Sequence, residues 1–212
     1  MSLFITFEGS EGCGKSTQAK ALLRKLSRLG IPTVLTHEPG GTALGNQLRR
    51  ILKRGHHDKI SPLAELFLFA ACRIQLVTEI IRPNLQQGNL VICDRFADST
   101  TVYQGYGRGL DLETVRKINE LATQGIKPKL TIWLDIPTQK GLGRKQYSTN
   151  DRFESEDLAF HDKIRDGYLK LAAEEPERWL VIDATLPRGR IGKIIWDRIN
   201  QLLQAEKTQR HE

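Results

Sequence analysis

The stretch that most limits how this chain can fold is GSEGCGKS, which runs from Gly9 to Ser16. It matches G-x-x-x-x-G-K-[ST], the pattern of a phosphate-binding loop that needs a strand before it and a helix after it. Residues 3–7 are an apolar run typical of a buried strand, and the leucines of residues 17–26 recur at helical spacing. The start of the chain is therefore predicted to be a strand–loop–helix unit that binds a polyphosphate.

The residue types of this loop explain how it would hold phosphate. Glycine lacks a Cβ, so backbone N–H groups can approach an anion closely, and the positive end of the following helix adds to the attraction. Lys15 is expected to reach the β- and γ-phosphates, and the Ser16 hydroxyl to bind a Mg²⁺ ion that bridges them. The predicted phosphate contacts are Gly9, Ser10, Glu11, Gly12, Cys13, Gly14, Lys15, Ser16 and Thr17.

Length, charge and cysteine usage narrow the class of protein. The 212 residues suffice for one domain, and no apolar run reaches the ~18 residues of a membrane span. The three cysteines have no paired spacing, which favours the cytoplasm. The net charge of +7 fits either nucleic-acid binding or an enzyme that handles two phosphorylated ligands. We favour the enzyme, because no basic stripe interleaved with aromatic residues is present.

Strand-like and helix-like segments alternate along the whole chain, which predicts parallel βαβ units. The expected fold is an α/β fold, a five-stranded parallel sheet with helices on both faces. The expected strands are residues 3–7, 31–36, 89–93, 130–134 and 179–183. The expected helices are residues 17–26, 43–53, 62–81 (ended by Pro83), 110–123, 138–147, 156–173 and 191–203.

Three charged residues stand out in this pattern. Asp94 and Arg95 follow a fully apolar strand, at the sheet edge where parallel α/β folds bind ligands. Arg73 lies four residues after Phe69 on the apolar stripe of a predicted helix. A buried guanidinium is costly unless an anion pairs with it, so Arg73 either binds an anionic ligand or pairs with a structural carboxylate. The pattern alone leaves both alternatives open.

The segment around residues 141–155 is basic, polar and rich in turn-forming residues. It fits a lid that closes over phosphates and excludes water, or an ordinary exposed loop.

Several motifs together resemble one family, the bacterial thymidylate kinases, which phosphorylate thymidine monophosphate (dTMP). The motifs are ITFEG leading into the phosphate-binding loop, EPGGT at 38–42, LFAACR at 68–73, DRF at 94–96, YQG at 103–105 and DRFE at 151–154. The resemblance covers nearly the whole chain. It implies one P-loop kinase domain over residues 1–212 with a short lid at about 141–155, and transfer of the γ-phosphoryl group of ATP to dTMP for dTTP synthesis. It also implies Mg²⁺ as cofactor and a homodimer, with no nucleic-acid or membrane partner.

The resemblance assigns the acceptor site residue by residue. Phe69 would stack on thymine and Arg73 would bond the base edge, with Thr100 and Gln104 completing the base contacts. Serine is more usual in the family at the position of Thr100. Tyr103 would pack under the sugar. The acceptor phosphate would be bound by Arg49 and Arg95 and ordered by Glu38 and Asp94.

The loop interior Glu11-Gly12-Cys13 carries no arginine, and resemblance to the bacterial type of the family implies that the catalytic arginine comes from the lid. By resemblance, Arg152 would stabilise the transferred phosphoryl group and Arg144 would contact adenine. Lys15, Arg95 and Asp94 would complete the catalytic set.

Two other classes remain as alternatives at this stage. A kinase for another nucleoside or deoxynucleoside monophosphate would share the fold and the loop but not the thymine contacts. A DNA-dependent ATPase would account for the positive charge. A GTPase is disfavoured, because no Asn-Lys-x-Asp segment is present.

Overall fold

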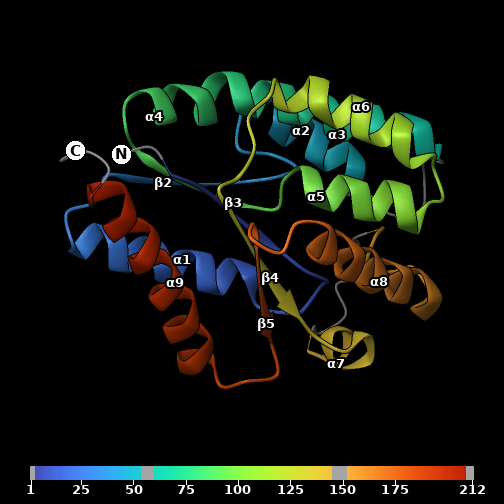
Figure 1. Ribbon diagram of the computed structural model, residues 1–212. Coiled ribbons are helices and arrows are strands. Elements are labelled where there is room, and N and C mark those ends of the chain that lie inside the picture. The colour runs from blue at the N-terminus through green and yellow to red at the C-terminus, as the bar shows by residue number, and fades with distance from the viewer. Residues whose placement is uncertain (1–2, 54–59, 145–151, 209–212) are drawn as a thin grey trace.

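A computed structural model describes residues 3–53, 60–144 and 152–208, and the predicted sheet is present (Figure 1). All five strands run parallel in the order β2-β3-β1-β4-β5. The strands are β1 (Phe4–Glu8), β2 (Thr33–His37), β3 (Leu90–Asp94), β4 (Leu130–Asp135) and β5 (Trp179–Asp183). The order changes direction around β1, so the loops after β1 and β3 open side by side at the carboxyl edge of the sheet.

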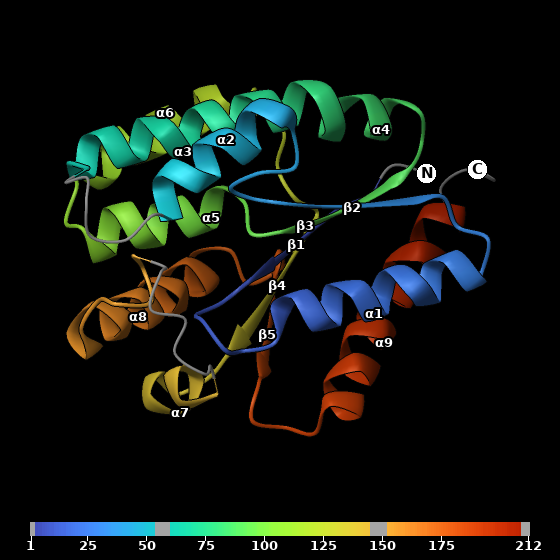
Figure 2. The same cartoon turned by 180° about the vertical axis from the view of Figure 1, so that it is seen from behind.

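Helices cover both faces of the sheet, as both views show (Figures 1 and 2). Helices α1 and α9 lie together on one face, and α3, α6 and α8 lie on the other. The helical segments are α1 (Lys15–Arg28), α2 (Ala43–Lys53), α3 (Pro62–Leu76), η1 (Val77–Ile81), α4 (Arg82–Gln86), α5 (Ala97–Thr100), η2 (Thr101–Gly107), α6 (Leu112–Thr123), α7 (Thr138–Gly143), α8 (Leu158–Glu174) and α9 (Arg188–Thr208). None of those described is both long and apolar enough to cross a membrane.

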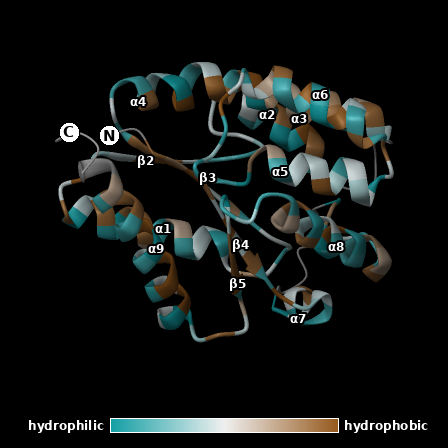
Figure 3. Ribbon diagram, viewed as in Figure 1, coloured by the Kyte–Doolittle hydropathy of each residue, from teal (hydrophilic) through white to brown (hydrophobic). Residues whose placement is uncertain are grey.

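The core follows from the alternation of side chains along each strand. Ile5 and Phe7 of β1 pack with α1 and α9, whereas Phe4 packs with η1 on the opposite face. Figure 3 shows the result, with hydrophobic strands at the centre and helices that carry both hydrophobic and hydrophilic residues. Because both faces are covered, the carboxyl edge is where polar side chains can gather.

The prediction that Pro83 ends the long helix is wrong. The chain stays helical through the π-helical turn η1 and on to Gln86 in α4. Proline disrupts a helix interior by removing an N–H and by clashing with the preceding turn, but it is tolerated at the start of a helical segment. Here the wide turn of η1 ends just before Arg82, so Pro83 falls in the first two positions of α4.

The stretch from Phe96 to Gly109 is mostly helical, which the sequence did not indicate. Its glycines obscure the helix but are needed for close packing. A Cβ on Gly105 would lie 2.6 Å from a Leu112 methyl carbon, and one on Gly107 would lie 2.8 Å from the Phe160 ring. Of the helix expected at 138–147, the structure describes the part that forms α7. Residues 145–151, which belong to the expected lid, lie outside the described residues.

Candidate active site

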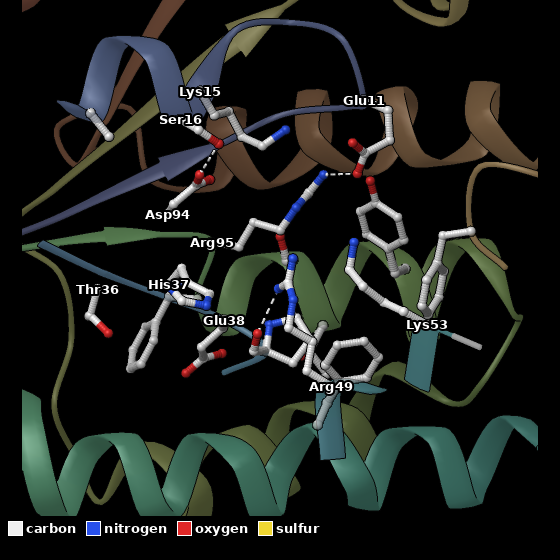
Figure 4. Close-up of a pocket in the computed structure, with 18 of the residues that line it drawn as sticks. Glu11, Lys15, Ser16, Thr36, His37, Glu38, Arg49, Lys53, Asp94 and Arg95 are labelled. Carbon is white, nitrogen blue, oxygen red and sulfur yellow. Dashed lines mark hydrogen bonds and ion pairs between the residues drawn. The ribbon is translucent and has the colours of Figure 1, made fainter. Parts of the chain in front are cut away.

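A cavity of about 610 Å³ lies at the carboxyl edge of the sheet. Figure 4 shows Lys15, Ser16 and Asp94 on one side of it and Glu38 and Arg49 on the other. The predicted site residues that line it are Glu11, Gly12, Gly14, Lys15, Ser16, Thr17, Glu38, Arg49, Phe69, Arg73, Asp94, Arg95, Thr100, Tyr103 and Gln104. The lining described does not include Gly9, Ser10, Cys13, Arg144 or Arg152.

The phosphate-binding loop has the geometry that its sequence predicts. The loop turns through positive φ angles at Gly12 and Gly14, and a Cβ on Gly12 would lie 2.0 Å from the carbonyl oxygen of Gly141. Lys15 opens α1 and is 7% exposed. Its ammonium group donates to the carbonyl oxygens of Gly9 at 2.9 Å and Ser10 at 2.8 Å. A cation and the N-terminus of a helix therefore meet in one loop, which favours an anion there.

Two side chains whose oxygen atoms are suited to bind a metal ion lie beside the loop. The hydroxyl of Ser16 donates to Oδ2 of Asp94, at the end of β3 (Figure 4). The other carboxylate oxygen of Asp94 is buried and has no hydrogen-bond partner within the described parts of the chain. Hydroxyl and carboxylate oxygens are the ligands that Mg²⁺ prefers, and a buried oxygen without a partner fits a cation.

Arg95 lies between the loop and the predicted acceptor site. Its backbone has a φ of 71°, which is uncommon for a non-glycine residue. Its guanidinium donates to Glu11 at 2.6 Å and to Ser99 at 3.2 Å, and lies 5.0 Å from the ring centroid of Tyr103 (Figure 4). A positive charge is therefore held between the loop and the predicted sugar site.

The contacts of Arg73 show a carboxylate partner, and its role toward a ligand stays a prediction. Arg73 is 1% exposed and donates to Oε2 of Glu38 through Nε at 2.9 Å and Nη2 at 2.7 Å. It also donates to Asn119 at 2.7 Å and Thr100 at 2.8 Å. A carboxylate therefore pairs with Arg73, yet both members of the ion pair line the cavity. Burial raises the pKa of Glu38, and the charge of Arg73 opposes that shift.

Cationic side chains gather beside this pair. Arg49 lies on α2 and donates to the carbonyl oxygen of Pro39 at 2.7 Å, and Lys53 lines the same wall (Figure 4). Partial burial, together with the positive charges of Arg49 and Lys53, lowers the pKa of His37. The wall is thus positive, which suits a phosphate.

The ring of Phe153, which was not predicted to be part of the site, lies beside the two predicted aromatic residues. Phe153 lies 5.9 Å from the ring centroid of Phe69 and 5.9 Å from that of Tyr103. It lines the cavity, in the DRFE motif at the border of the expected lid. The three rings contribute apolar surface to the cavity.

The two arginines expected from the lid have protein partners outside the cavity lining. Arg152 pairs with Glu65 on α3, and Arg144 donates to the carbonyl oxygen of Ala184 after β5 at 2.9 Å. Glu65 is fully buried and also binds Gln104 at 2.7 Å. Neither catalysis by Arg152 nor an adenine contact by Arg144 is tested by these positions, and both stay predictions.

Sequence reasoning missed Glu8, the last residue of β1. It is fully buried and accepts hydrogen bonds from the Phe96 N–H at 2.8 Å, the Ser99 hydroxyl at 2.5 Å and the Tyr168 hydroxyl at 2.9 Å. Burial and the nearby charge of Asp98 raise the pKa of Glu8 to about 7. The sequence feature that could have identified Glu8 is an acidic residue at the end of an apolar strand. Glu65 was also missed, although it could have been identified because it precedes Phe69 by four residues on the same helical face as Arg73.

Comparisons with known proteins find similarity to thymidylate kinases. Residues 7–195 match the family model described as thymidylate kinase. A thymidylate kinase of Dehalococcoides mccartyi is 56% identical over 204 residues, which cover 96% of this chain and 99% of the relative. One of Trichlorobacter lovleyi is 46% identical over 204 residues, covering 93% and 96%. The crystal structure of thymidylate kinase from Ehrlichia chaffeensis superposes with a TM-score of 0.76 at 35% identity, covering 95% of this chain and 98% of the other.

Proposed function

Because this chain belongs to the thymidylate kinase family, we propose that the cavity binds ATP and dTMP and transfers the γ-phosphoryl group between them, giving dTDP and ADP for dTTP synthesis. The observation that carries the assignment of the site is the continuity of the cavity. It joins the phosphate-binding loop to a pocket that contains Arg73, Thr100 and Gln104. A phosphate donor and a base-reading acceptor site therefore share one space.

The donor half holds the phosphates of ATP. The glycine loop and the N-terminus of α1 direct backbone N–H groups at them. Lys15 exchanges its contacts with the carbonyl oxygens of Gly9 and Ser10 for contacts with the β- and γ-phosphates. Arg144, at the end of α7, contacts adenine.

Ser16 and Asp94 fit a magnesium ion, because they offer a hydroxyl and a carboxylate oxygen without another partner in the described structure. Held by these two residues, Mg²⁺ would supply positive charge that offsets the negative charge of the ATP phosphates. Asp94 also orders the end of β3 beside the acceptor phosphate.

The acceptor half holds dTMP. Phe69 stacks on the base, and Arg73, Thr100 and Gln104 read its edge. Tyr103 packs under the sugar. Arg49 and Arg95 bind the 5′-phosphate, and Glu38 keeps Arg73 in place through their buried ion pair.

The transfer step needs alignment more than proton removal. The second pKa of a phosphate monoester is about 6, so the attacking oxygen is already anionic near neutral pH. Two anions must then be brought into line and their repulsion reduced. Lys15, Arg95 and the lid residue Arg152 supply the positive charge. For Arg152 to act, it must leave Glu65 and reach the phosphates.

The assembly and location that we propose are a homodimer in the cytoplasm. Helix α3 keeps Leu63, Phe67 and Ile74 between 43% and 55% exposed on one face, away from its cavity residues. A second copy that packs on this face would bury them. Cys13, Cys72 and Cys93 are all free, which suits a reducing compartment.

The function is tested by measuring ADP release from ATP and magnesium with a panel of nucleoside monophosphates. We expect strong preference for dTMP, with dTDP as product. Turnover with another monophosphate would overturn the base contacts and leave the fold intact. A control with DNA and no monophosphate is expected to give no stimulation, and turnover only there would overturn the kinase assignment.

The dimer is tested by sedimentation velocity. Phe67→Glu is expected to give monomers, because it places a charge on the proposed interface. Leu169→Glu on α8 is the matched control, since Leu169 is 44% exposed on another helix. Equal behaviour of the two variants would exclude this face as the interface.

A further inference from the structure

Glu65 is a buried carboxylate that ties three parts of the site together. It lies in the first turn of α3 and has no exposed surface. Its Oε1 accepts hydrogen bonds from Gln104 at 2.7 Å and from Arg108 at 3.3 Å, and its Oε2 pairs with Arg152. A carboxylate is buried at great cost unless such donors surround it. Glu65 is not among the residues that line the cavity, so it acts through its partners.

The contact with Glu65 decides which way the Gln104 amide points. An ionised carboxylate can only accept hydrogen bonds, so the NH₂ group of Gln104 must face it. The amide group is planar, and its oxygen therefore lies on the side away from this nitrogen. Gln104 is 1% exposed yet lines the cavity. The free end that it can present to a ligand is a hydrogen-bond acceptor.

We propose that Glu65 is a positioning residue that sets the choice of pyrimidine by fixing the Gln104 amide oxygen toward the cavity. This rests on the proposed function, in which Gln104 contacts the base. The N3 of thymine or uracil carries a hydrogen and can donate to that oxygen. The N3 of cytosine is an acceptor and would meet the amide oxygen with no hydrogen between them. Glu65 thereby rejects cytosine without touching it.

The test compares kcat/KM for dTMP and for dCMP in the wild type and in Glu65→Gln. A glutamine at 65 can donate as well as accept, so the Gln104 amide is free to turn and offer its NH₂ group to cytosine. We expect the dTMP-to-dCMP ratio to fall about tenfold or more, the worth of one buried hydrogen bond, with KM for ATP unchanged. The ratio is the informative quantity, because release of Arg152 would change turnover of both substrates alike.

Arg108→Gln is the matched control. Arg108 shares Oε1 of Glu65 with Gln104, so this variant removes a positive partner and leaves the amide contact in place. We expect its ratio to equal that of the wild type. An active Glu65→Gln enzyme with an unchanged ratio overturns the proposal, and so does an equal fall of the ratio in Arg108→Gln. Failure of the proposed function is distinguishable, because the wild type would then not phosphorylate dTMP.

A measurement on the wild type keeps the proposal testable even if Glu65→Gln does not fold. In ¹⁵N-labelled protein, the side-chain amide signals of Gln104 can be identified by their loss in Gln104→Ala. We expect these N–H groups to exchange slowly with solvent in the wild type and in Arg108→Gln. Rapid exchange in the wild type would overturn the contact on which the proposal depends.

Discussion

The donor and acceptor halves of the cavity are built in different ways. The donor half is mainly one segment, Gly9 to Ser16, whose own backbone carbonyls hold Lys15. The acceptor half collects Glu38, Arg73 and Gln104 from three elements or loops that are far apart in sequence, and it depends on a buried ion pair. A phosphate-binding loop can thus be specified locally, whereas base recognition requires the whole sheet to be folded. Substitutions in the donor half should therefore change rate alone, and those in the acceptor half should change both binding and stability.

The largest expected effect tests which half Arg152 serves. Arg152→Ala is expected to lower kcat by about 10³-fold, because an arginine that stabilises the transferred phosphoryl group contributes that much or more. Single-turnover kinetics would separate this from nucleotide binding. Unchanged turnover with weaker nucleotide binding would contradict the assignment and transfer the role to Arg144 or Lys145.

Lys15→Ala tests whether the donor half is independent of folding. We expect kcat/KM to fall about 10²- to 10³-fold, with a change of less than about 1 kcal/mol in the free energy of unfolding. Steady-state kinetics and urea denaturation measure the two quantities. Arg24→Ala on the same helix is the control and should match the wild type, because Arg24 is exposed. A large loss of stability in Lys15→Ala would show that the loop is not a self-contained unit.

Arg73→Ala makes the opposite test on the acceptor half. KM for dTMP is expected to rise about 10- to 100-fold, because a charged hydrogen bond is lost, while KM for ATP changes little. The protein should also lose about 3 kcal/mol of stability, since Glu38 remains buried without its partner. Arg82→Ala on α4 serves as the control. Equal losses for both substrates would make Arg73 a purely structural residue.

The smallest expected effect concerns Glu8, which lies between the halves. Its pKa is raised from 4.5 to about 7, so the folded state binds its proton more tightly than the unfolded state. The free energy of unfolding should therefore contain a contribution that is present below about pH 4.5 and is lost as pH rises through about 7. We expect at most about 3 kcal/mol from this group. Urea denaturation at pH 5 and pH 7.5 should show a smaller difference in Glu8→Gln than in the wild type.

Glu113→Gln is the control for the Glu8 measurement. Glu113 is a highly exposed carboxylate that pairs with Lys117 within α6. Its variant should keep the wild-type difference between the two pH values. The same loss of pH dependence in both variants would mean that Glu8 titrates normally.

The contrast between the halves also explains what the sequence could predict. The strands, their parallel arrangement and the phosphate-binding loop follow from contiguous patterns, and the structure confirms the sheet. The roles of Phe69 and Arg73 came from family resemblance, because their spacing showed only a shared helical face. The sequence could not show that Arg73 pairs with a carboxylate, because its partner Glu38 follows strand β2 and is far away in the sequence.

The residues that were missed share one property. Glu8, Glu65 and Phe153 act through partners that are distant in sequence, such as Tyr168 for Glu8. No local pattern encodes such a pairing. The position of Pro83 was misjudged for a related reason, because a π-helical turn is set by packing of the whole segment and has no strong sequence signal.

The second π-helical turn, η2, has a consequence for how the gene can change. Thr101–Gly107 carries Tyr103 and Gln104 on wide turns, in which each hydrogen bond spans one more residue than in an α-helix. Deleting one residue there would let the turn tighten into an α-helix, which changes the direction of the side chains within the turn itself. Base-contacting groups would then point away from the cavity. The segment should therefore accept no insertion or deletion, and its length is constrained as strictly as the identity of its two glycines, Gly105 and Gly107.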